Sequence, residues 1–118
     1  MREKIVAGNW KMNTSIEEGR QLVEDILAGM DRVPEGVSLI VAPPFTHLFL
    51  IAHLLGNRKN PGLAAQNCAD KKSGAYTGEV SASMLASVPC GYVILGHSEG
   101  GNITQKRIRR YWKRSNWH

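Results

Sequence analysis

The chain has 118 residues, which is room for one small domain. Its formal net charge of +5 invites a nucleic-acid-binding interpretation, but residues 1–99 hold nine Lys and Arg against ten Asp and Glu, so the whole excess lies in residues 100–118. Two cysteines are too few for a disulfide framework, no apolar stretch approaches the roughly 20 residues that span a bilayer, and the N-terminus does not resemble a signal peptide. These properties predict a cytoplasmic protein with reduced thiols and no membrane contact.

Compact apolar runs alternate with stretches of helical periodicity along residues 4–95. In chain order they predict a strand over 4–10, a helix capped by Thr14 or Ser15, a strand over 37–42, a helix over 46–55, a strand over 63–66, a Gly-rich loop over 67–78, a short helix over 79–87 and a strand over 91–95. Strands that are apolar throughout and separated by helices indicate a parallel sheet with crossover helices. Periodicity leaves open whether the sheet is doubly wound or part of a (β/α)₈ barrel.

Polar residues follow three of these strands, where parallel α/β folds place their sites. They are Asn9 and Lys11, then Gln66 and Asn67, then His97, Ser98 and Glu99. A Lys beside an Asn and a His suits an anionic substrate that carries a carbonyl, because the Lys neutralises charge and the other two can hydrogen-bond an oxygen that becomes negative. Each residue alone has a plainer interpretation, as a surface charge or a structural histidine. His47, His53 and His118 lack the spacing of metal ligands, so no metal site is predicted.

Five segments together resemble triosephosphate isomerase, in that family's order and at its spacings. They are Ala7-Gly8-Asn9-Trp10-Lys11-Met12-Asn13, Ala42-Pro43-Pro44-Phe45, Ala65-Gln66-Asn67, Gly74-Ala75-Tyr76-Thr77-Gly78-Glu79 and Gly96-His97-Ser98-Glu99. The resemblance implies that residues 1–99 are the N-terminal half of a (β/α)₈ TIM barrel, truncated after four parallel strands. It also implies the interconversion of dihydroxyacetone phosphate and glyceraldehyde 3-phosphate through an enediolate, without a cofactor. A different sugar-phosphate barrel enzyme is disfavoured because all five segments match one family.

The resemblance also implies a role for individual residues. Asn9 and Lys11 would bind substrate, with Lys11 facing its negative charge, and His97 would be the neutral electrophile at the carbonyl oxygen. Glu99 would position the Lys. Tyr76 and Thr77 lie on the loop that enters the partner subunit of the family's homodimer. A triose phosphate and a second subunit are therefore the expected partners, and nucleic acid is not.

The family's catalytic Glu on the sixth strand and its phosphate-binding loops have no counterpart in these residues. A full barrel takes roughly 250 residues, so four strands would leave two bare edges and an exposed inner face. Without the base, the chain alone is predicted to be inactive.

Residues 100–118 are predicted to be a separate basic tail. Where the family has Arg-Arg and a run resembling x-Tyr-His-x-Glu-x-Asp, this chain has Gly100-Gly101. The possible codons of residues 100–108, taken from one base earlier, can encode Arg-Arg-Gln-Tyr-His-Ala-Glu-Lys-Asp, which predicts a frameshift after the Glu99 codon. The alternative is a genuine tail, whose cations would make the chain a non-catalytic module that binds a polyanion.

Overall fold

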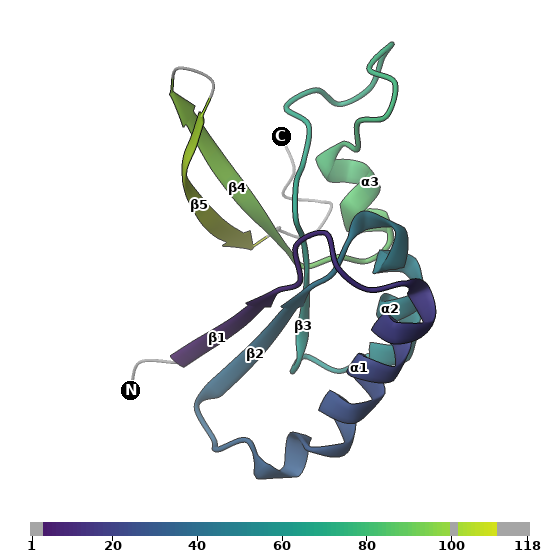
Figure 1. The fold of residues 1–118 in the computed structure, drawn as a ribbon, viewed down its shortest axis with the longest axis vertical. Coiled ribbons are helices and arrows are strands. Elements are labelled where there is room, and N and C mark those ends of the chain that lie inside the picture. The colour runs from purple at the N-terminus through teal and green to yellow at the C-terminus, as the bar shows by residue number, and fades with distance from the viewer. Residues whose placement is uncertain (1–3, 100–101, 111–118) are drawn as a thin grey trace.

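Strands and helices alternate along the chain as far as β4, which then forms a hairpin with β5 (Figure 1). The computed structural model describes residues 4–99 and 102–110, of which 96–99 and 102–110 are described as backbone only. Its strands and α-helices are β1 (Lys4–Asn9), α1 (Ile16–Ala28), β2 (Val37–Ala42), α2 (Leu48–Leu55), β3 (Gly62–Ala65), α3 (Ala82–Ser87), β4 (Tyr92–Glu99) and β5 (Asn102–Arg110), with 3-10 turns at Met30–Arg32 and Phe45–His47. No helix of the described part is long and apolar enough to cross a bilayer.

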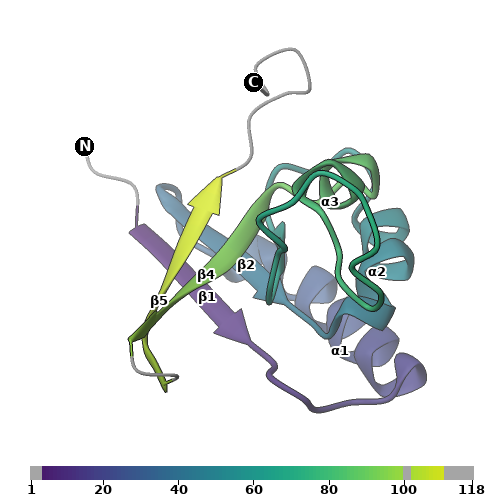
Figure 2. The ribbon, with the colours of Figure 1, turned by 90° about the horizontal axis from the view of Figure 1, so that it is seen from above.

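The five strands form one sheet in the order β1-β2-β3-β4-β5. Each of the first four is parallel to its neighbour, as predicted. The sheet curls, and α1, α2 and α3 all lie on one side of it (Figures 1 and 2). A doubly wound sheet carries helices on both faces, whereas a barrel carries them only outside. The architecture is therefore α/β and is that of half a barrel.

The predicted bare edge at β4 is wrong for the described chain. β5 runs antiparallel to β4 and pairs with it from Tyr92 opposite Arg110 to Glu99 opposite Asn102, with an irregularity after His97. This pairing also extends β4 beyond its predicted end at residue 95. An open strand edge presents unpaired backbone groups, so an extended segment beside it can pair with it without any apolar pattern of its own.

Helix α1 begins with a capping box. The Ser15 hydroxyl accepts a hydrogen bond from the Glu18 amide at 3.2 Å, and the Glu18 carboxylate accepts one from the Ser15 amide at 2.9 Å. Of the two predicted caps, Ser15 is therefore the one in use. Hydrogen bonds that the Glu18 carboxylate accepts from Ser15, first from its backbone amide and then from its side chain, lower the pKa of Glu18.

The second and third helices are shorter than predicted because their first residues adopt other structure. The predicted helix over 46–55 begins as the 3-10 turn Phe45–His47 and becomes α-helical from Leu48. The third helix starts after Ser81, whose hydroxyl accepts a hydrogen bond from the Met84 amide at 3.2 Å. Residues 79 and 80 belong instead to the preceding loop, since the Val80 carbonyl accepts a hydrogen bond from the Ala69 amide at 2.8 Å.

Alternate residues of the strands form two apolar clusters. The larger cluster joins the outer face of the sheet to the three helices and contains Val23, Val41, Ile51, Leu63, Leu85 and Val93. The smaller cluster lies on the inner face and contains Ile40, Ala42, Ala64 and Ile94, each at most 6% exposed. The inner face of β2, β3 and β4 is thus buried, which corrects the prediction that it would be exposed.

Strand β1 is exposed along its whole length. Ile5 and Val6 point to opposite faces of the sheet and are 56% and 57% exposed. The predicted bare edge therefore exists at β1 within the described residues.

Candidate active site

The loop that follows β1 carries the predicted substrate-binding residues. Asn9 ends the strand, and its side-chain oxygen accepts a hydrogen bond from the Lys11 amide at 2.9 Å. The Trp10 amide donates to the Ala42 carbonyl at 3.0 Å, which ties the loop to the end of β2. The Lys11 side chain is exposed and its backbone has φ +57°, in the left-handed region. The loop thus presents an ammonium group at the carboxyl ends of the parallel strands.

Gln66 connects this loop to the end of β3. Its side-chain nitrogen donates to the Lys11 carbonyl at 2.8 Å and to the Ala42 carbonyl at 2.9 Å. One amide group therefore joins the segments that follow β1, β2 and β3. Sequence analysis placed Gln66 at a strand end but gave it no role.

His97 and Glu99 lie in β4, beyond its last parallel pair with β3, which is Ala65 with Val93. At this level β4 is paired with β5, and His97 is opposite Gln105. The side chains of His97 and Glu99 lie outside the described part of the chain. The structure therefore brings Asn9, Lys11 and Gln66 together by hydrogen bonds, and gives only the backbone position of the predicted electrophile and of Glu99.

The predicted partner-binding loop projects above α3 (Figure 1) and is closed at its base by the Ala69–Val80 hydrogen bond. Tyr76 and Thr77 are both exposed. The Tyr76 ring packs against Gly74, where an added Cβ would come within 2.9 Å of the ring. A pocket of about 180 Å³ lies next to Gln66, between Phe45 and the two ends of this loop. The loop therefore projects from the fold and carries an exposed aromatic residue, Tyr76.

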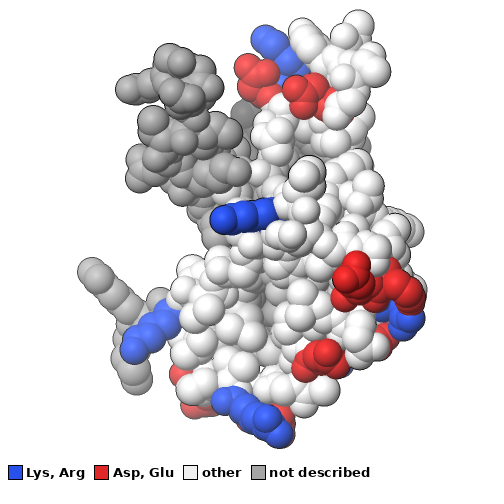
Figure 3. All heavy atoms as spheres, in the orientation of Figure 1, with Lys and Arg blue, Asp and Glu red and all other residues white. Residues whose placement is uncertain are grey.

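Charges on the described surface are mixed. Figure 3 shows some Lys and Arg beside Asp and Glu and others apart from them, with no continuous basic area on the face in view. On α1, Arg20 makes ion pairs with Glu17 and Glu24. No group of three or more His, Cys, Asp or Glu side chains within the described residues is arranged to hold a metal ion.

Comparisons with known proteins give one consistent family. The sequence model described as triosephosphate isomerase matches residues 4–114. The match therefore includes most of residues 100–118, which were predicted to be a separate tail. The triosephosphate isomerases of Porphyromonas gingivalis and Bacteroides fragilis are each 50% identical to this chain over 99 residues, or 84% of this chain and 39% of theirs. That of Symbiobacterium thermophilum is 52% identical over 103 residues, or 84% of this chain and 38% of its own.

The chain thus spans about two fifths of the length of these relatives. The family model covers far more than half of the chain, and the matched region folds as half of a barrel with Asn9 and Lys11 at its carboxyl rim. The chain belongs to the triosephosphate isomerase family.

Proposed function

We propose that this chain supplies the substrate-binding and electrophilic part of a triosephosphate isomerase site. In this proposal Asn9 and Lys11 bind the triose phosphate, His97 donates a hydrogen bond to the carbonyl oxygen, and Glu99 positions Lys11. The observation that carries the proposal is the hydrogen-bonded group of Asn9, Lys11 and Gln66 at the strand ends of a chain that belongs to this family. A fixed ammonium group next to hydrogen-bond donors stabilises the negative charge of an enediolate.

A chimera tests these roles. Residues 1–99 of this chain would replace the matching region of the Porphyromonas gingivalis relative, and isomerase activity would be measured. We expect activity in the chimera and a loss of at least about a hundredfold in kcat/KM for Lys11→Met or His97→Gln, since each removes stabilisation of the charged intermediate. Lys59→Met, at an exposed position outside the site and the partner-binding loop, is the matched control. A folded chimera with wild-type rates in the Lys11 and His97 variants would contradict the proposal.

The chain by itself is proposed to be inactive. The base and the phosphate-binding loops that the family resemblance implies have no counterpart in its sequence, and a catalytic set that lacks one essential member loses most of its rate enhancement. The purified 118-residue chain should therefore show no turnover above the buffer background. Normal isomerase turnover by this chain would contradict this part of the proposal.

We also propose that the protein is a cytoplasmic homodimer whose subunits contact each other through the loop of Tyr76 and Thr77. Exposed apolar side chains on nearby segments support it: Met12 is 95% exposed, Phe45 55% and Met84 53%. Analytical ultracentrifugation of the chimera tests it. Thr77→Arg should weaken the dimer, whereas Lys72→Ala on the same loop should not. A dimer that is unaffected by Thr77→Arg would contradict the proposed contact.

Residues 100–118 are proposed to be the product of a frameshift after the Glu99 codon. The composition of β5 supports this, because residues 102–110 carry four cations and no acid. A parallel barrel strand is apolar throughout, so a strand of this composition does not suit that position. The nucleotide sequence tests it. A displaced frame that lacks a Glu-bearing sixth strand and Gly-rich phosphate loops would refute the frameshift.

A further inference from the structure

The short segment from Lys11 to Thr14 is bounded by two unusual backbone conformations. Lys11 has φ +57° and Thr14 has φ +78°, and they are the only residues other than glycine with positive φ among those described. L-residues with side chains rarely adopt such angles, because Cβ then approaches the following carbonyl oxygen. Conformations of this kind persist only where the surrounding structure holds them, and they gather at functional sites.

Each of these two residues has its carbonyl oxygen held by a side chain from a distant element. Gln66 donates to the Lys11 carbonyl at 2.8 Å. His47 Nε2 lies 3.1 Å from the Thr14 carbonyl oxygen and 3.2 Å from the Thr14 hydroxyl. Because a carbonyl can only accept, Nε2 carries the proton, and Nδ1 is then free to accept from the Thr46 hydroxyl at 2.8 Å. A single neutral tautomer of His47 thus satisfies its neighbours at both ring nitrogens.

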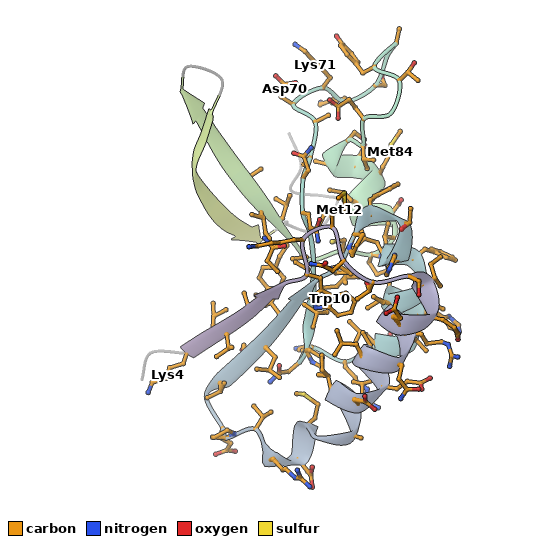
Figure 4. All side chains as sticks on the ribbon, in the orientation of Figure 1. Lys4, Trp10, Met12, Asp70, Lys71 and Met84 are labelled. Atoms are coloured by element: carbon orange, nitrogen blue, oxygen red, sulfur yellow. The ribbon has the colours of Figure 1, made fainter. Side chains whose placement is uncertain are left out.

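Both anchoring side chains are themselves fixed in place. His47 is 3% exposed and lies beneath α1, where the backbone of Gly19 leaves room for it. Trp10 packs against the same glycine, and Figure 4 shows it between the sheet and the helices. Gln66 makes its second hydrogen bond to the Ala42 carbonyl at the end of β2. The two ends of the Lys11–Thr14 segment are therefore connected to different rigid parts of the fold.

We propose that Gln66 and His47 are positioning residues that hold Lys11–Thr14 in this conformation and so direct the Lys11 ammonium towards an anionic substrate. The inference rests on the proposed function, in which Lys11 binds the triose phosphate. Neither anchor needs to touch that substrate. A lysine whose backbone is fixed loses less conformational freedom when it binds an anion than one on a mobile loop.

The test uses the full 118-residue chain and the variants Gln66→Met and His47→Phe, which remove the two donors. His53→Phe is the matched control, because His53 is an exposed residue on α2. Gln66→Glu also removes the donor and is used if Gln66→Met fails to fold, whereas His47→Gln keeps a donor and is the rescue variant for His47→Phe. The first measurement is the one-bond Cα–Hα coupling of Lys11 and Thr14, which responds to the sign of φ. The second is a titration of the chimera described above, which takes its phosphate-binding loops from the relative, with glycerol 3-phosphate, followed at the Lys11 side-chain resonances.

We expect Lys11 to lose its positive φ in Gln66→Met and Thr14 to lose its positive φ in His47→Phe. The dissociation constant for glycerol 3-phosphate, followed at the Lys11 resonances, should then rise by about tenfold or more, because small misplacements at a binding site have large effects. In His53→Phe both properties should be unchanged. His47→Gln, which keeps a donor, should restore part of the affinity.

The two hypotheses fail in different ways. If both variants fold and keep positive φ at Lys11 and Thr14, or change only the global unfolding free energy, the positioning role is overturned. If φ changes as expected but the chimera with unsubstituted residues 1–99 shows no saturable shift with glycerol 3-phosphate, the anchoring is supported and the proposed function is overturned.

Discussion

Gly19 of α1 faces the rings of His47 and Trp10. An added Cβ would lie 2.6 Å from His47 Cδ2 and 3.2 Å from Trp10 Cζ3. Alanine is the better helix former by about 1 kcal/mol, yet the His47 ring is buried and cannot move away easily. We therefore expect Gly19→Ala to lower the free energy of unfolding by about 1–3 kcal/mol, as overpacking does.

Urea denaturation measures this effect, with Gly91→Ala as the control because an added Cβ there meets nothing within 4 Å. A Gly19→Ala chain as stable as the original would mean that His47 and Trp10 are less closely held than the structure has them.

Cys90 is a second residue with a measurable consequence. Burial raises the pKa of its thiol from 9.0 to about 11. The folded state therefore favours the protonated thiol, and the corresponding stability is complete below pH 9 and is lost as the pH rises towards 11. Between pH 8 and 10.5 the free energy of unfolding should fall by about 2 kcal/mol more in this chain than in Cys90→Ala.

The comparison requires urea curves at both pH values for each protein, each referred to its own value at pH 8. Lysines and tyrosines titrate in both proteins, so their effects cancel in the difference. Equal pH dependence in the two proteins would show that Cys90 does not titrate differently on folding.

Some site residues could be predicted from the sequence and others could not, for a physical reason. Asn9 and Lys11 could be predicted because they directly follow an apolar run, and parallel strands present their carboxyl ends at one rim. The contacts of Gln66 and His47 could not, because these side chains bond to backbone groups 55 and 33 residues away. Nothing in the local pattern around His47 distinguishes a histidine that orients a loop from one that fills the core.

At the scale of elements, one side chain extends the pairing between β2 and the segment that leads into β3. The two strands are paired at Ile40 with Gly62 and at Val41 with Leu63. Beyond them the Asn60 side chain takes the place of a strand backbone, since it accepts from the Leu39 amide at 2.8 Å and donates to the Val37 carbonyl at 2.9 Å. Asn60→Ala leaves both groups without this partner and should cost about 1–3 kcal/mol.

Hydrogen exchange locates that effect. In Asn60→Ala the Leu39 amide should exchange faster and the urea midpoint of unfolding should be lower. Asn57→Ala, at an exposed position between α2 and β3, should change neither property. Unaltered protection of Leu39 would contradict the proposed side-chain pairing.

Elements with a distinct pattern were predicted well, and those formed by pairing alone were not. The strand over 37–42 has the predicted bounds, and α1 begins at one of its two predicted caps. Residues 102–110 carry four cations and two isoleucines that do not alternate, so no strand was predicted there. These residues form β5 because they pair with the open edge of β4. That edge is a property of the sheet, so the sequence of residues 102–110 alone does not predict the strand.

At the scale of the whole molecule, the two ends of the sheet differ. β1 has no partner on its outer edge within the described residues, and Ile5 and Val6 are more than half exposed on opposite faces. At the other end β5 covers the edge of β4 with a strand rich in cations, and charged residues are a common means of protecting a sheet edge. The chain is therefore an open half of a barrel with one protected end and one unprotected end.

Removal of residues 100–118 tests this asymmetry. The shortened chain would leave β4 unpaired on that side, so its amides should lose protection from hydrogen exchange and the chain should associate at lower concentration than the full chain. Val6→Lys, which places a charge on the other edge strand, should reduce association in both forms, whereas Leu22→Lys on α1 should not.

Binding to heparin at low and high salt, measured on the same samples, addresses the polyanion alternative, since such binding should be salt-dependent and lost with the tail. If the shortened chain neither associates more readily nor exchanges its β4 amides faster, β5 does not protect the sheet, and any loss of heparin binding would then make the tail a binding segment in its own right.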